Sequence, residues 1–165
     1  MLHTLRTRAG SKPADEPAEL LLACHGRLRH FSATAVALAT RLDLDEKQID
    51  EACGELVRYF RVALPLHEAD EEVTLAPRLE PLMTDAGALD RMRRQHVAIH
   101  DTLDVLLPQW DARDVRATSE PAHVLAALLD AHLTLEETVI FPCLSQIPAP
   151  DRKRLFEEMR ARRSF

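Results

Sequence analysis

Histidine and glutamate side chains stand four residues apart in three separate stretches of this 165-residue chain. The stretches are HEADE, HVAIH and HLTLE, and the paired residues in them are His67 with Glu71, His96 with His100, and His132 with Glu136. On an α-helix, two side chains at this spacing lie on the same face, roughly 40° apart around the axis. Each pair lies within a stripe of apolar residues, and a fourth apolar stripe carries the lone His25. The chain is therefore expected to fold into helices that turn these polar groups into a shared core.

The helical period of the apolar residues extends along the whole chain. Only four glycines are present, and no segment of strand length alternates β-branched with polar residues. This pattern predicts an all-α fold. We expect long helices at about 15–42, 45–76, 86–107 and 119–141, then a short amphipathic C-terminal helix at about 151–163. Four long helices with short connections predict an antiparallel up-down-up-down four-helix bundle, which can build a metal site from inward side chains.

Capping residues and prolines set the expected boundaries of these helices. Asp15 can cap the first helix and Ser119 the fourth, while Pro108 is expected to end the third. Pro65 falls inside the second helix, where a proline forfeits a hydrogen bond and clashes with the preceding turn. A kink just before His67 is the prediction, and a break into two helices is the alternative.

Length and charge narrow the class of protein. The chain has room for one domain, with residues 1–14 expected as a disordered tail and residues 15–165 as the domain. The net charge of −6 argues against nucleic acid as a partner. No apolar run approaches the roughly 20 residues that span a bilayer, and the N-terminal segment lacks the apolar stretch of a secretory signal. We therefore expect a cytoplasmic protein that does not act at a membrane.

Five imidazoles and two carboxylates turned into one core predict a metal centre. They are too many for one tetrahedral zinc ion, and they suit two octahedral ions bridged by carboxylates. Imidazole and carboxylate without thiolate favour iron or manganese over a structural zinc site. The alternative is a set of core side chains satisfied by hydrogen bonds. It fails for the whole set because each buried carboxylate costs several kcal/mol unless it is paired or bound to metal.

A faint internal repeat relates the second helix to the fourth. HEADEEVTLAP (67–77) and HLTLEETVIFP (132–142) share a histidine, two consecutive glutamates and a final proline. The two helices are thus expected to form equivalent walls of one site. The second glutamates, Glu72 and Glu137, are expected to face water or to hydrogen-bond neighbouring helices.

The cysteines show no spacing for a disulfide framework or a zinc site. Cys24, Cys53 and Cys143 are expected as small buried or half-buried hydrophobes. A redox role for Cys24, which directly precedes His25, is the alternative.

The full pattern H…HxxxE…HxxxH…HxxxE resembles the hemerythrin family, specifically its bacterial HHE cation-binding branch, over about residues 17–145. The resemblance implies a non-heme di-iron site with carboxylate bridges and an oxo or hydroxo bridge. One iron would be held by His96, His100 and His132, and the other by His25 and His67. Glu71 and Glu136 would bridge both. The iron with two histidines would keep an open position for a small diatomic or peroxide ligand such as dioxygen, peroxide or nitric oxide.

One departure from the family pattern concerns the residues after His132. Oxygen-carrying hemerythrins place an aspartate five residues after the last histidine, whereas this chain has Glu136 at i+4 and Glu137 at i+5. This pattern is similar to that of HHE proteins linked to iron sensing, nitric oxide stress and repair of iron centres, and it leaves Glu137 as an alternative bridge. The resemblance predicts a protein that binds a small oxidant for sensing, buffering or delivery. The alternatives are a redox enzyme acting on peroxide or nitric oxide, an oxidase, and an iron-handling or repair protein. No redox or signalling partner is specified.

Overall fold

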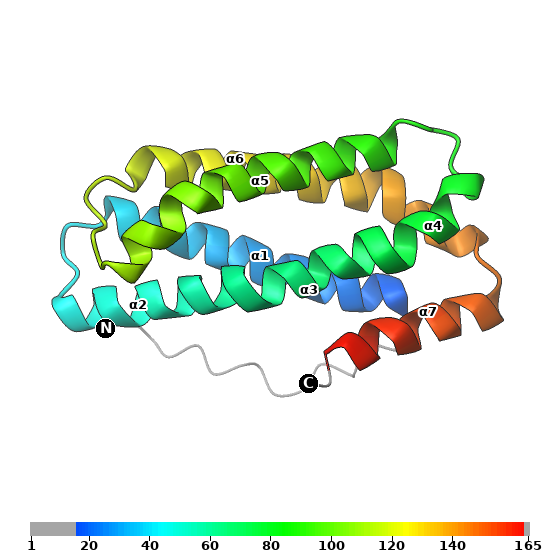
Figure 1. The fold of residues 1–165 in the computed structure, drawn as a ribbon, viewed down its shortest axis with the longest axis horizontal. Coiled ribbons are helices and arrows are strands. Elements are labelled where there is room, and N and C mark those ends of the chain that lie inside the picture. The colour runs from blue at the N-terminus through cyan, green and yellow to red at the C-terminus, as the bar shows by residue number, and fades with distance from the viewer. Residues whose placement is uncertain (1–15, 164–165) are drawn as a thin grey trace.

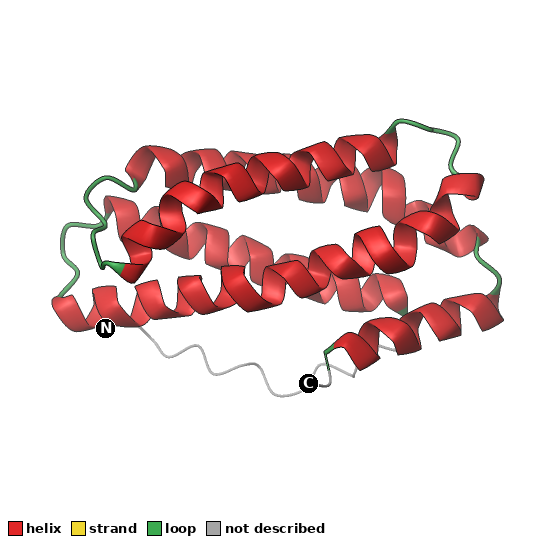
Figure 2. Ribbon diagram, viewed as in Figure 1, coloured by secondary structure: helices red, strands yellow, loops and turns green. Residues whose placement is uncertain are grey.

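A computed structural model describes residues 16–163, and every regular element in that range is a helix (Figure 2). The all-α prediction is therefore confirmed. The long elements are α1 (Pro17–Thr40), a run from α2 (Glu46–Arg58) to α4 (Ala76–Leu79), α5 (Ala88–Asp111), and α6 (Ser119–Leu135) with its extension to Gln146. Figure 1 shows them side by side, successive ones running in opposite directions, with the shorter α7 (Ala149–Arg162) against one end. The predicted tail at 1–14 and the predicted cap Asp15 lie outside the described residues.

The second long helix continues through Pro65 instead of breaking there. Before the proline, segment η1 (Tyr59–Ala63) is a π-helical turn, in which Leu64 N–H donates to the Tyr59 carbonyl five residues back. This wide turn accommodates Pro65, which has no N–H to donate, and the helix resumes as α3 (Leu64–Ala69). The run also extends beyond the predicted end at 76, to α4 and a 3₁₀ turn at Glu80–Leu82.

Two more π-helical turns occur in the described chain, and both halves of the sequence repeat contain one. They are η2 (Asp70–Leu75) and η4 (Glu136–Ile140), and like η1 each ends two residues before a proline: Pro77 and Pro142. Ala76 N–H donates to the carbonyl of Glu71, and Phe141 N–H donates to the carbonyl of Glu136. Single π turns of this kind are common at functional sites. The repeated HxxxEExxxxP motif thus encodes a backbone shape as well as side chains.

Helix α5 ends later than expected. The prediction that Pro108 ends it is wrong, because the helix continues to Asp111 and Ala112 N–H donates to the Pro108 carbonyl at 3.1 Å. A proline removes only its own hydrogen bond, and the last turn is fixed by Trp110. That indole is fully buried and stacks on Phe60 with 5.8 Å between ring centroids.

The apolar core is divided in two by a polar layer. One cluster of buried residues includes Leu28, Leu64 and Leu129, and the other includes Leu21, Leu75 and Ile140. On α1, His25 lies between Leu21 of one cluster and Leu28 of the other. Six of the seven predicted ligand residues occupy the same intermediate level on their helices, so the fold places them together in the middle of the bundle.

Candidate metal centre

Six of the seven predicted ligands meet in this polar layer. Their ligand atoms form two groups of four, within which all atoms lie within 4.8 Å of one another: His25, His67, Glu71 and Glu136, and Glu71, His96, His132 and Glu136. None of the six residues is more than 4% exposed. Glu71 and Glu136 belong to both groups, as two carboxylates shared between a pair of neighbouring cations would.

Each shared carboxylate contacts two imidazoles in the same way. Glu71 lies 2.8 Å from Nε2 of His67, four residues before it, and 3.2 Å from Nε2 of His96 on α5. Glu136 lies 3.4 Å from Nε2 of His132, four residues before it, and 3.1 Å from Nε2 of His25 on α1. The two helices are equivalent walls of one site, as the repeat predicted.

Most inward-facing atoms of this layer contact only one another, and not in hydrogen-bonding geometry. Nε2 of His25, His67 and His96, and both carboxylate oxygens of Glu71 and Glu136, are buried without a hydrogen bond among the described residues. Native interiors rarely leave so many polar atoms unsatisfied, because each carries a desolvation cost. Cations between these atoms would satisfy them. The donor set of imidazole nitrogen and carboxylate oxygen therefore fits a metal centre, and it fits iron better than a thiolate-preferring ion.

The surroundings shift the pKa values of the two shared carboxyl groups in opposite directions. Burial raises the pKa of Glu136 well above its usual range, and the nearby charge of Glu71 raises it further. Burial is the largest single effect on Glu71 and opposes its ionisation, but the charge of His67 and the contacts with His67 and His96 together outweigh it and lower the pKa of that carboxyl. Burial lowers the pKa of His132 to about 3, so its imidazole is neutral at physiological pH. Two adjacent buried carboxylates cannot both ionise without compensation, and bound cations would supply it.

Three of the four clustered histidines form a hydrogen bond through Nδ1, on the side of the ring that faces away from the shared carboxylates. The distances to the holding oxygen are 2.7 Å for His25 and Glu137, 2.6 Å for His96 and Glu72, and 3.2 Å for His132 and Gln95. An acceptor at this position fixes the proton on Nδ1 and leaves Nε2 free to bind a cation. Glu72 and Glu137 thus hydrogen-bond neighbouring helices, as expected. The role of Gln95 has no signal in the sequence beyond its place directly before His96.

Glu137 does not join the ligand atoms, so the structure favours Glu136 over the alternative bridge. The Glu137 side chain is 27% exposed and also accepts a hydrogen bond from Arg29 at 3.0 Å, which lowers the pKa of that carboxyl.

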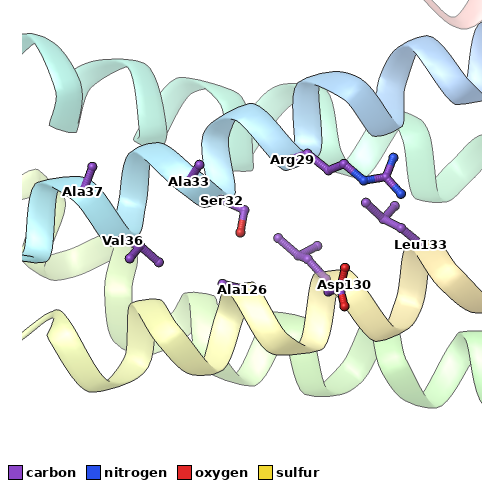
Figure 3. Close-up of a pocket in the computed structure, with 9 residues that line it drawn as sticks. Arg29, Ser32, Ala33, Val36, Ala37, Ala126, Asp130 and Leu133 are labelled. Atoms are coloured by element: carbon purple, nitrogen blue, oxygen red, sulfur yellow. The ribbon is translucent and has the colours of Figure 1, made fainter.

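Arg29 also lines one end of an apolar groove of about 430 Å³ between α1 and α6. Figure 3 shows Arg29 and Leu133 at that end, and small residues such as Ala33 and Ala126 along the rest.

The structure leaves His100 outside the layer. Its side chain is 46% exposed, and its Nε2 lies 2.7 Å from an Oε2 of Glu68. The inward stripe of α5 passes from His96 to Ile99, which is fully buried, rather than to His100. A helical period of 3.6 falls between these two positions, and the apolar side chain takes the buried one. The group around His96 therefore has two histidines instead of the three expected.

The family follows from a comparison with known sequences. Residues 16–144 match the family model described as the hemerythrin HHE cation binding domain, a range that contains all six clustered residues. The chain belongs to the hemerythrin HHE cation-binding family. It is also similar to a Haemophilus influenzae protein described as uncharacterized, with 25% identity over 130 residues, covering 74% of this chain and 76% of that protein. Family and geometry together mark this hemerythrin-family chain as a metal-binding protein. None of its described helices combines the length and apolar content that crossing a membrane requires.

Proposed function

We propose that this hemerythrin-family protein carries a non-heme di-iron centre that binds dioxygen or a related small oxidant, peroxide or nitric oxide, for sensing, buffering or delivery. The observation that carries the proposal is the membership of Glu71 and Glu136 in both ligand groups. Helical bundles with carboxylates shared in this way hold two metal ions side by side. The proposal includes the antiparallel up-down-up-down order of the bundle and a cytoplasmic location, without nucleic acid or membrane as partners.

The residues divide evenly between the two ions. His25 and His67 would hold one iron, His96 and His132 the other, and the two glutamates would bridge them. Two imidazoles and two shared carboxylates would leave coordination positions of each ion unfilled, and exogenous oxygen species would bind there. Iron, when bound, supplies the redox centre at which the oxidant binds.

The protein's own side chains prepare this centre for a small ligand. Glu137 and Glu72 keep a proton on the outer nitrogens of His25 and His96, which makes those imidazoles better donors. Apolar clusters on both sides exclude bulk water, and the ring of Phe141 lies 5.0 Å from that of His25. Such surroundings admit a small neutral molecule more readily than a polar substrate.

The first test is the visible absorption spectrum of the iron-loaded, anaerobically reduced protein as oxygen is admitted and then removed. A charge-transfer band that appears and then disappears under argon would support reversible binding. A band that persists would support redox turnover of the oxidant instead, and a protein that binds no iron would refute the proposal.

Ligand variants test the assignment separately. His67→Ala or Glu71→Ala should lower the iron content from two ions per chain, because each removes a donor from a group that has only four. Glu55→Ala, at an exposed position of α2, is the matched control and should retain both ions. An iron content that is the same in all these variants would refute the ligand set.

A further inference from the structure

A second, smaller pocket lies on the outer side of His67. It has a volume of about 170 Å³, far above the ~10–15 Å³ that one water molecule needs. Its polar lining comes from Cys24, Arg27, Tyr59, His67 and Arg163, and the rest is apolar. Cys24 is a buried free thiol, as the sequence predicted. No carboxylate lines the pocket, and its wall carries two guanidinium groups and the imidazole of His67.

The two arginines differ in how their charge is balanced. Arg163 pairs with the buried carboxylate of Asp70 and reaches Cys24 Sγ at 3.6 Å. Arg27 donates to the same sulfur at 3.1 Å, and within residues 16–163 it forms no ion pair with a carboxylate. Arg27 is exposed, so its guanidinium lies at the solvent side of the pocket, and no described carboxylate balances its charge.

His67 turns a buried, unsatisfied atom towards this pocket. The residue is 1% exposed and its Nε2 faces Glu71, which leaves Nδ1 on the opposite side of the ring. No described nitrogen or oxygen atom pairs with Nδ1, whereas the other three clustered histidines have Glu137, Glu72 or Gln95 at this position. The thiol of Cys24 hydrogen-bonds His67, but a thiol is a weak partner and its sulfur also accepts from two guanidinium groups.

We propose that this pocket binds a small inorganic oxyanion of phosphate size or less. Its oxygens would accept hydrogen bonds from the guanidinium of Arg27 and from His67 Nδ1, and its charge would balance Arg27. A guanidinium presents its N–H groups as a fork that matches the oxygens of such anions. The anion would serve His67 as Glu137 serves His25, on the far side of the imidazole from Glu71. It is thus an outer partner of the metal centre and not a metal ligand.

Calorimetric titration of the full-length, metal-loaded protein with sodium phosphate at fixed ionic strength tests the proposal. One anion should bind per chain with a saturable heat. Arg27→Gln should weaken binding at least tenfold, and Arg27→Lys, which keeps the charge, should lose less. Arg58→Gln makes the same change at an exposed arginine of α2 outside the pocket and should leave binding unchanged.

Iron content measured on each variant separates the pocket from the metal centre. Loss of phosphate binding in Arg27→Gln with iron content intact is the expected result. Phosphate binding that survives in Arg27→Gln, or that is lost only together with the iron, would assign the anion to another place and overturn the proposal. So would the absence of saturable binding to the unaltered protein.

Discussion

Glu71 and Glu136 occupy the same place in two copies of one backbone motif, in which the carbonyl of the glutamate accepts the N–H of the residue five positions later. Both carboxylates are buried in the polar layer, and the following glutamate in each copy holds a histidine of a neighbouring helix. The motif thus supplies an inner ligand and an outer support from adjacent residues. A regular α-helix would turn these two side chains about 100° apart as well, but it would not include the wide turn ahead of the proline.

Pro142→Ala should weaken metal binding without unfolding the protein. Removing the ring allows the helix to close the wide turn into a regular one, which would shift Glu136 relative to His132. We expect metal affinity to fall roughly tenfold, at the lower end of the ~10–100-fold range for groups that support a ligand. Competition with a chromophoric chelator measures the affinity, and Pro150→Ala in α7 serves as the control. An unchanged affinity would mean that the wide turn does not position the carboxylate.

Glu137→Gln should weaken metal binding by removing the negative charge behind His25. The amide still offers an oxygen to Nδ1, so the imidazole keeps its orientation but becomes a poorer donor. We expect an affinity loss of about tenfold, and a similar loss for Glu72→Gln behind His96. The same chelator competition applies, with Glu51→Gln at an exposed position of α2 as the control. Equal affinities in all three variants would contradict the supporting role.

His96→Ala and His100→Ala should differ sharply, although both histidines belong to the same HVAIH stretch. His96→Ala should lower the iron content, because its Nε2 belongs to a ligand group. His100→Ala should retain both ions and change the free energy of unfolding by less than ~1 kcal/mol, the usual range for an exposed ion pair. Iron analysis and urea unfolding measure the two effects. Loss of iron in His100→Ala would mean that this side chain moves inward when metal binds.

Asp70→Ala should destabilise the fold. Asp70 is completely buried beside Glu71, and its carboxylate pairs with Arg162 and Arg163 at the C-terminal end of α7. Arg162 also donates to Thr74 at 3.0 Å. We expect a loss of roughly 2–3 kcal/mol in urea unfolding, below the ~3–5 kcal/mol of a fully buried pair because both arginines are about one-quarter exposed.

The matched control for this variant is Asp43→Ala, which removes an exposed pair with Arg41 and should cost much less stability than Asp70→Ala. If the two variants lost the same stability, α7 would not be fixed through Asp70.

Much of the site was predictable because helical periodicity and ligand spacing report on the same face of a helix. The i,i+4 pairs His67 with Glu71 and His132 with Glu136 meet as the spacing indicated. The third pair, His96 with His100, does not meet in the site. A helical period of 3.6 residues places the next buried position between Ile99 and His100, so spacing alone cannot decide which of them is buried. That choice depends on the neighbouring helix, where Glu68 offers His100 a partner at the surface.

Prolines were the other feature that the sequence alone could not resolve. The sequence shows where a proline stands but not whether the backbone breaks, widens or continues, because the outcome depends on tertiary packing. At Pro65 the helix widens, and at Pro108 it continues under the buried indole of Trp110. The contact between Asp70 and the two arginines joins residues more than 90 positions apart, and no local pattern predicts it.

The division of the apolar core by a polar layer has a consequence for cooperative unfolding. A small bundle with one continuous apolar core is expected to unfold as a single cooperative unit. Here the two apolar clusters are separated by a layer of polar side chains. Without cations, the negative charges of Glu71 and Glu136 in that layer would repel each other. Metal ions would be the main coupling between the halves, so their loss should broaden the thermal transition or split it in two. Metal occupancy would then be reported by the sharpness of melting as well as by its temperature.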